Sequence, residues 1–97
     1  MRYRIGLVPE AVEDLKKLSE PYRSAIKDAI EAHLRHEPMK ESKSRIKRLR
    51  DLEYPQFRLR VGEYRVFYDV RGQTVEVLAI VPKAKAAEWL KRAGGVE

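Results

Sequence analysis

An alternating stretch on either side of Gly62-Glu63 constrains the fold more than any other part of this sequence. Phe57–Val61 reads Phe-Arg-Leu-Arg-Val, and Tyr64–Tyr68 reads Tyr-Arg-Val-Phe-Tyr. Apolar and polar residues that alternate on both sides of a two-residue connection beginning with glycine are typical of a β-hairpin with a type II′ turn. The chain is therefore expected to contain an antiparallel sheet that includes this hairpin.

The turn decides which residues oppose each other across the hairpin. If Val61 opposes Tyr64, the other pairs are Arg60 with Arg65, Leu59 with Val66, Arg58 with Phe67, and Phe57 with Tyr68. Opposed residues share a face of the sheet, and so do residues two apart along one strand. One face is then apolar core, formed by Phe57, Leu59, Val61, Tyr64, Val66 and Tyr68. The other face carries Arg58, Arg60, Arg65 and Phe67.

Three arginines on one face of a hairpin indicate an anion-binding site. Like charges that oppose each other across strands are unfavourable, so stability alone does not explain the cluster. A planar guanidinium binds phosphate through two parallel hydrogen bonds and stacks on bases, and Phe67 would add an aromatic surface. The alternative interpretation is an ordinary solvent-facing set of arginines, balanced by Glu53, Glu63 or Asp69.

A second basic feature precedes the hairpin. The window from residue 40 to residue 50 holds six basic residues and one acidic residue, Glu41, and so carries +5 of the net charge of +6. Its basic residues are Lys40, Lys43, Arg45, Lys47, Arg48 and Arg50. Such a patch predicts a polyanionic partner, above all nucleic acid. We take Lys43, Arg45, Lys47, Arg48, Arg50 and Phe67 as the predicted RNA-binding residues; the alternative is a solvated charge run.

Composition limits the remaining possibilities. Ninety-seven residues with 43% hydrophobic content predict one domain spanning residues 1–97. The chain has no cysteine, so disulfides and thiolate metal sites are excluded, and its two histidines, His33 and His36, lack an acidic partner at ligand spacing. We expect neither a metal nor another cofactor. Without an apolar run of about 20 residues or a signal-peptide pattern, a cytoplasmic protein with no membrane partner is expected.

The order of predicted elements indicates the fold class. Strands are expected at residues 3–8, 45–49, 57–61, 64–70 and 74–81, and helices at residues 9–18, 20–36 and 84–93, the last of them closed by Gly94-Gly95. The strand at 74–81 is apolar on both faces, which favours a central position, whereas 45–49 should be an edge strand. The order β-α-α-β-β-β-β-α predicts an α+β domain. It should have a mainly antiparallel twisted sheet, an N-terminal helical hairpin on one face and a short C-terminal helix anchored by Trp89.

This layout and the residues of Phe57–Tyr68 resemble the RelE/ParE superfamily of toxins from type II toxin-antitoxin systems, and RelE more closely. The resemblance runs from Pro9-Glu-Ala-Val-Glu-Asp-Leu15 through Pro38 to Lys83. It implies a fold of the microbial RNase type and an antitoxin that holds the toxin inactive. RelE-type toxins cut messenger RNA in the ribosomal A site without a metal, whereas ParE-type toxins act on DNA gyrase.

The resemblance also implies roles for particular residues. In RelE-type nucleases, basic residues of the first hairpin strand and an arginine of the second contact the scissile phosphate, which corresponds here to Arg58, Arg60 and Arg65. Relatives often carry a further arginine or histidine after the last strand, and a tyrosine or histidine near the C-terminus. Residues 81–90 contain no histidine or tyrosine, which leaves Lys83 and Lys85 as catalytic candidates.

Three hypotheses therefore stand. The leading one is a ribosome-dependent messenger RNA endoribonuclease that inhibits translation, with the ribosome, messenger RNA and an antitoxin as partners. The second is a ParE-type gyrase inhibitor, or a degenerate member that binds nucleic acid or ribosomes without cleavage. The third is a binding module whose partner is the antitoxin alone. In the endoribonuclease hypothesis, arginine is suited to stabilising negative charge but is a poor general base, because its pKa is too high for it to give up a proton at neutral pH.

Overall fold

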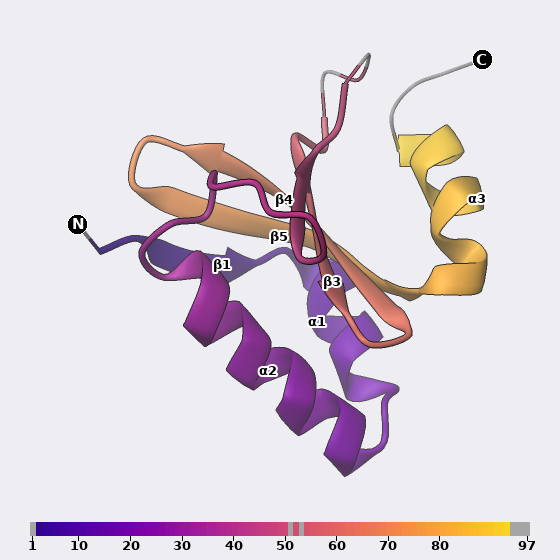
Figure 1. Cartoon of the computed structure of the whole chain (residues 1–97). Coiled ribbons are helices and arrows are strands. Elements are labelled where there is room, and N and C mark those ends of the chain that lie inside the picture. The colour runs from indigo at the N-terminus through magenta and orange to yellow at the C-terminus, as the bar shows by residue number, and fades with distance from the viewer. Residues whose placement is uncertain (1, 51, 53, 94–97) are drawn as a thin grey trace.

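The computed structural model describes residues 2–50, 52 and 54–93 (Figure 1). Its elements are β1 (Arg4–Leu7), α1 (Pro9–Lys16), α2 (Glu20–Leu34), β2 (Ile46–Arg48), β3 (Phe57–Val61), β4 (Tyr64–Arg71), β5 (Thr74–Pro82) and α3 (Lys83–Ala93). The predicted order of elements is confirmed. Glu53 and Gly94-Gly95, which entered the predictions above, lie outside the described residues.

The strands form a five-stranded mixed sheet in the order β1-β5-β4-β3-β2. β1 runs parallel to β5, and the other three pairings are antiparallel, so the sheet is mainly antiparallel as predicted. β2 is an edge strand, also as predicted. β5 is internal between β1 and β4, which agrees with its apolar residues on both faces, although β4 is the middle strand.

The hairpin of β3 and β4 has the predicted register at every pair. Val61 opposes Tyr64, Arg60 opposes Arg65, and Phe57 opposes Tyr68 at the far end. Gly62 has a φ of 57°, the left-handed conformation that a primed hairpin turn requires at its first residue. The turn glycine and the alternation therefore specify the same pairing.

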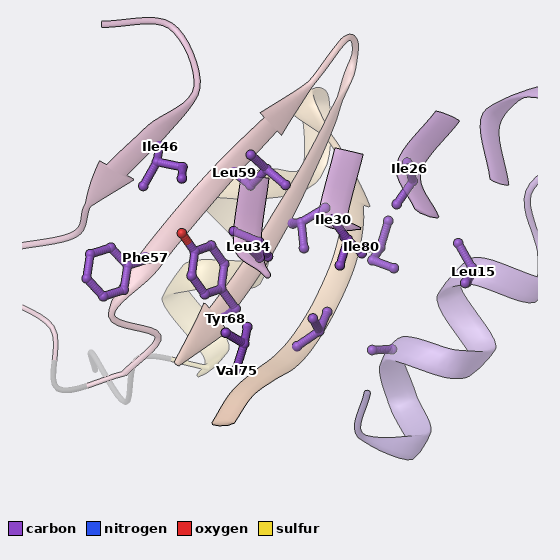
Figure 2. Close-up of a cluster of buried hydrophobic side chains, with 13 residues drawn as sticks. Leu15, Ile26, Ile30, Leu34, Ile46, Phe57, Leu59, Tyr68, Val75 and Ile80 are labelled. Carbon is purple, nitrogen blue, oxygen red and sulfur yellow. The ribbon is translucent and has the colours of Figure 1, made fainter. Parts of the chain in front are cut away.

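Both N-terminal helices pack on one face of the sheet and bury the main core (Figure 2). Pro9 and Pro21 start α1 and α2 in their first turns, where the missing amide proton costs nothing. Apolar residues of α1 and α2 then meet the predicted apolar face of the hairpin, with Ile26, Leu59 and Val66 almost fully buried. The amide of Ile80 donates a 2.9 Å hydrogen bond to Asp14 Oδ2, which ties α1 to β5.

Tyr68 lies within this core among residues from both helices and strands (Figure 2). Its ring stacks on Phe57 with the centroids 5.5 Å apart, and its hydroxyl donates a 2.6 Å hydrogen bond to the carbonyl of Pro38. Pro38 is itself fully buried, so this bond anchors the segment after α2 to the middle strand. Burial raises the pKa of the Tyr68 phenol well above its usual value.

α3 packs on the opposite face of the sheet from α1 and α2 (Figure 1). A second, smaller apolar cluster forms there from Phe67, Ala79 and Trp89. The indole of Trp89 stacks on the ring of Phe67 with centroids 4.9 Å apart and planes 5° apart, which confirms the predicted packing of Trp89 on the sheet. Among the described helices, none has the length and apolarity needed to cross a bilayer.

We predict that Tyr68→Phe lowers the free energy of unfolding by about 1–3 kcal/mol, because the buried Pro38 carbonyl loses its partner while the packing is kept. The raised pKa of Tyr68 adds a pH dependence. The folded state disfavours the phenolate, so the wild-type protein should lose this stabilisation as the pH rises above about 10, the value in the unfolded chain. Urea unfolding of both proteins between neutral and alkaline pH should show a difference that shrinks at high pH; a difference that grows would contradict this account.

Candidate nucleic-acid interface

Basic side chains from β2, β3 and β4 gather on the face of the sheet that α1 and α2 leave uncovered. Lys47 opposes Arg58 across β2 and β3, and Arg60 opposes Arg65 across β3 and β4. Opposed residues share a face, as do residues two apart along β3. We call the resulting set the basic face: Lys47, Arg58, Arg60 and Arg65. Lys47 and Arg60 are exposed, whereas Arg58 is half-buried.

The basic face lacks the carboxylate partners that a purely structural charge cluster would have. No ion pair within residues 2–50, 52 and 54–93 includes any of its members. Asp69, a predicted counter-charge, instead accepts a 2.8 Å hydrogen bond from the amide of Gln56 and lies 3.6 Å from Arg71. Glu63, the other described candidate, is likewise outside these ion pairs. The positive charge of this face is therefore available to an external anion.

Arg58 shows the strongest need for such an anion. Its Nε is buried and has no hydrogen-bond partner within the described part of the chain. Burial, together with the neighbouring charges of Arg65 and Arg60, lowers the pKa of its guanidinium. A buried unsatisfied donor is costly, and like charges add to that cost. A bound phosphate would offset the clustered positive charge.

Arg65 departs from the expectation of a solvent-facing residue. It is 7% exposed, and its Nη1 donates hydrogen bonds of 3.0 Å to the carbonyl of Gly62 and 2.9 Å to that of Tyr64. Its pairing partner on β5 is Val81, which packs against the apolar cluster of Phe67, Ala79 and Trp89. Arg65 thus holds the hairpin turn, and a direct phosphate contact through Nη1 would compete with those two bonds.

Phe67 also departs from the expectation, because it is buried and offers no open aromatic surface. The register places it on the predicted face, but it is 1% exposed because Trp89 of α3 covers its ring. It cannot stack on a base while α3 is packed in this way. The hairpin pattern gave no sign of this, because the covering residue comes from a helix more than 20 positions later in the chain.

The structure divides the predicted RNA-binding segment between two faces. Arg48 opposes Phe57, so it lies on the helix-covered face, where its guanidinium is 4.6 Å above the Phe57 ring. Arg50 lies 3.9 Å from Glu41. Lys43 and Arg45 are exposed in the segment that leads into β2. Among the residues of β2, Lys47 alone joins the basic face. The sequence signal for this is that Lys47 follows the apolar Ile46, because adjacent residues of a strand point to opposite faces.

The remaining candidates belong to α3. Lys83 and Lys85 are exposed on α3; the amide of Lys83 donates a 2.7 Å hydrogen bond to the carbonyl of Glu63, which brings the start of α3 to the hairpin turn. Glu88, 3.6 Å from Arg92, forms a surface ion pair.

The two histidines border a different site. His33 and His36 line a cavity of about 280 Å³ between the end of α2 and the segment that follows, and burial together with Arg45 lowers the pKa of His33. Among the described residues, no group of three or more His, Cys, Asp or Glu side chains is arranged to hold a metal ion.

Comparison with known proteins gives a consistent result. Residues 5–87 match a family model described as the ParE toxin of the type II toxin-antitoxin system parDE. Among curated proteins, none matches the chain.

Three similar solved structures have names that refer to RelE or RelBE2. The RelBE2 toxin-antitoxin complex of Mycobacterium tuberculosis is 26% identical with a TM-score of 0.72, over 84% of this chain and 99% of that chain. The archaeal RelE-RelB complex of Pyrococcus horikoshii is 23% identical with a TM-score of 0.63, over 88% of this chain and 99% of that chain. The free E. coli toxin RelE, as a double arginine-to-alanine mutant, is 23% identical with a TM-score of 0.72, over 99% of this chain and 96% of that chain.

We predict that Arg65→Ala destabilises the fold by about 1–3 kcal/mol, because it removes two charge-assisted hydrogen bonds that hold the hairpin turn and leaves a void beside Val81. Arg60→Ala serves as the matched control: it removes the same charge from the opposed position, but Arg60 is exposed and its loss should change stability by less than about 0.5 kcal/mol. Guanidinium-induced unfolding, followed by circular dichroism, measures both. Equal effects of the two substitutions would mean that the turn does not depend on Arg65.

Proposed function

The chain belongs to the ParE toxin family of type II toxin-antitoxin systems, within the RelE/ParE superfamily. From its basic face and its similarity to the RelBE2 toxin-antitoxin complex, we propose that it is a ribosome-dependent endoribonuclease that cleaves messenger RNA and inhibits translation. An antitoxin would hold it inactive, as expected for a toxin of this class. Its proposed place of action is the cytoplasm, where it would meet translating ribosomes. The observation that carries the proposal is that, among the described residues, the basic face has no carboxylate partner, and the Nε of Arg58 within it is buried and unsatisfied.

The proposed chemistry uses the basic face for charge stabilisation. The 2′-hydroxyl of the ribose gives up its proton and its oxygen attacks the adjacent phosphorus. The O2′–P bond forms, the P–O5′ bond breaks and the departing O5′ takes up a proton, which leaves a cyclic phosphate and a free 5′-hydroxyl with net transfer of one proton from O2′ to O5′. Negative charge increases on the phosphoryl oxygens as the fifth bond forms. Guanidinium groups fixed near these oxygens before the reaction stabilise that charge without reorganisation. Arg58 and Arg60, whose guanidinium groups make no ion pair among the described residues, are suited to this task, and Arg65 orders the hairpin turn that follows them.

A gyrase-directed activity is the second candidate, and two observations favour it. The matching family model is that of ParE toxins, and residues 81–97 contain neither histidine nor tyrosine for proton transfer. The basic face would then bind a different target without cleaving RNA.

One experiment separates the two candidates. After brief expression in cells, primer extension maps breaks in messenger RNA, while plasmid topoisomers from the same cells report gyrase activity. Ribosome-dependent breaks confined to translated regions support the proposal. Relaxed plasmids or DNA damage with intact messages would refute it in favour of gyrase inhibition.

We predict that Arg58→Ala lowers the rate of message cleavage by about 100- to 1000-fold, because it removes a charge stabiliser placed at the developing anion. Arg58→Lys should recover only part of the rate, since a point charge cannot replace two parallel hydrogen bonds. Single-turnover cleavage on purified translating ribosomes measures both. Arg48→Ala is the matched control, because it removes an arginine on the opposite face and should leave the rate within about threefold of the wild type. Wild-type cleavage by Arg58→Ala would show that this face is not the active site.

A further inference from the structure

A hollow of about 300 Å³ adjoins the basic face where the hairpin turn meets the edge of the sheet. Its lining residues are Ser44, Arg45, Arg60 and Gly62. The amide of Arg60 donates a 2.9 Å hydrogen bond to the carbonyl of Arg45, so the two arginines lie opposite each other where β2 begins. The hollow therefore has two guanidinium-bearing residues at its border, from different segments of the chain.

The charge balance of this hollow favours an anion. Among the described residues, none that lines the hollow is acidic, and neither Arg45 nor Arg60 forms an ion pair. All four lining residues are exposed, so an incoming group meets no barrier. Gly62 brings no side chain, and Ser44 supplies a hydroxyl donor. Guanidinium and hydroxyl groups together are the donors that proteins use to bind phosphate oxygens.

The position of the hollow relative to the basic face indicates which phosphate it would take. Arg60 borders the hollow and also lies two residues from Arg58 on the same face of β3. Neighbouring strands are about 4.8 Å apart, so a path from Arg65 on β4 across β3 to Arg45 covers roughly 10 Å. A bound polynucleotide would cross the strands along this path.

We propose that this hollow is a second phosphate subsite, which binds the backbone phosphate of a nucleotide that flanks the one held at Arg58. The identity of the ligand as single-stranded RNA rests on the proposed function, whereas the subsite itself rests on the two arginines and the hollow. Arg45 is a binding residue in this proposal, and Arg60 connects the two subsites. The protein should accordingly recognise a strand with several phosphates better than one with a single phosphate.

Binding of labelled RNA at several salt concentrations tests the subsite. The probes are a dinucleotide, with one phosphodiester, and a tetranucleotide, with three, measured by fluorescence anisotropy with the free toxin. Arg45→Gln should weaken tetranucleotide binding by about tenfold and reduce the salt slope by about 0.7, the contribution of one phosphate contact on a single strand, while dinucleotide binding stays unchanged. The matched control is Arg48→Gln, because it removes the same charge three positions later, on the opposite face. It should leave both probes unaffected.

Each alternative result has a defined meaning. If Arg45→Gln and Arg48→Gln reduce the salt slope equally, the basic segment acts as a diffuse charge and the subsite is refuted. If Arg45→Gln changes neither probe, or wild-type protein does not distinguish the two lengths, the subsite is also refuted. Because Arg45 is exposed, we expect Arg45→Gln to have the same unfolding midpoint as the wild type. An equal midpoint excludes misfolding as the cause of weaker binding. If primer extension finds no message cleavage but the length dependence and its loss in Arg45→Gln persist, the proposed enzyme activity fails and the subsite stands.

Discussion

The backbone ladder between β3 and β4 is the constraint on which the core and the basic face both depend. Side chains along a strand alternate between faces, so a slip of one residue would exchange every side chain of β3 between the core and the open face. Arg58 would then enter the core, and Leu59 would leave it. Gly62, with its positive φ, fixes the turn, and Arg65 holds the turn carbonyls from within the sheet. One register thus buries the core and presents the cations.

The two faces of the sheet have different roles because different helices cover them. α1 and α2 cover one face and bury aliphatic residues together with Phe57 and Tyr68. α3 covers only part of the other face, where Trp89 stacks on Phe67. The uncovered remainder carries the basic residues. Cations placed together without carboxylates reduce the stability of the free protein, and such a locally unfavourable arrangement is expected at a site that binds an anion.

The edge strand β2 extends the basic face and is protected from pairing with other strands. The hydroxyl of Ser42 accepts hydrogen bonds from the amides of Arg45 and Ile46, at 3.0 and 3.2 Å, and Glu41 Oε1 accepts one from the amide of Arg48 at 3.1 Å. The amides of Ile46 and Arg48 on the outer side of β2 are thereby bonded within the chain, which disfavours strand addition at this edge. The same contacts fix the backbone that carries Arg45 and Lys47. A short strand therefore connects the basic segment with the hairpin arginines.

The sequence by itself determined the hairpin register, the order of elements, the apolar face and the presence of three arginines on the other. These features follow from local rules: period-two alternation, glycine at the turn and proline at helix starts act within a few residues of the chain. The sequence did not reveal that Arg65 and Phe67 are buried. Trp89 of α3 covers Phe67, and Arg65 pairs with Val81 of β5 and folds back onto the carbonyls of the hairpin turn. A strand at 45–49 implies that Lys47 and Arg48 point to opposite faces, but which of the two joins the basic face depends on the pairing of β2 with β3. Alternation specifies which residues share a face, whereas the exposure of that face depends on which distant element packs against it, and only the tertiary structure decides this.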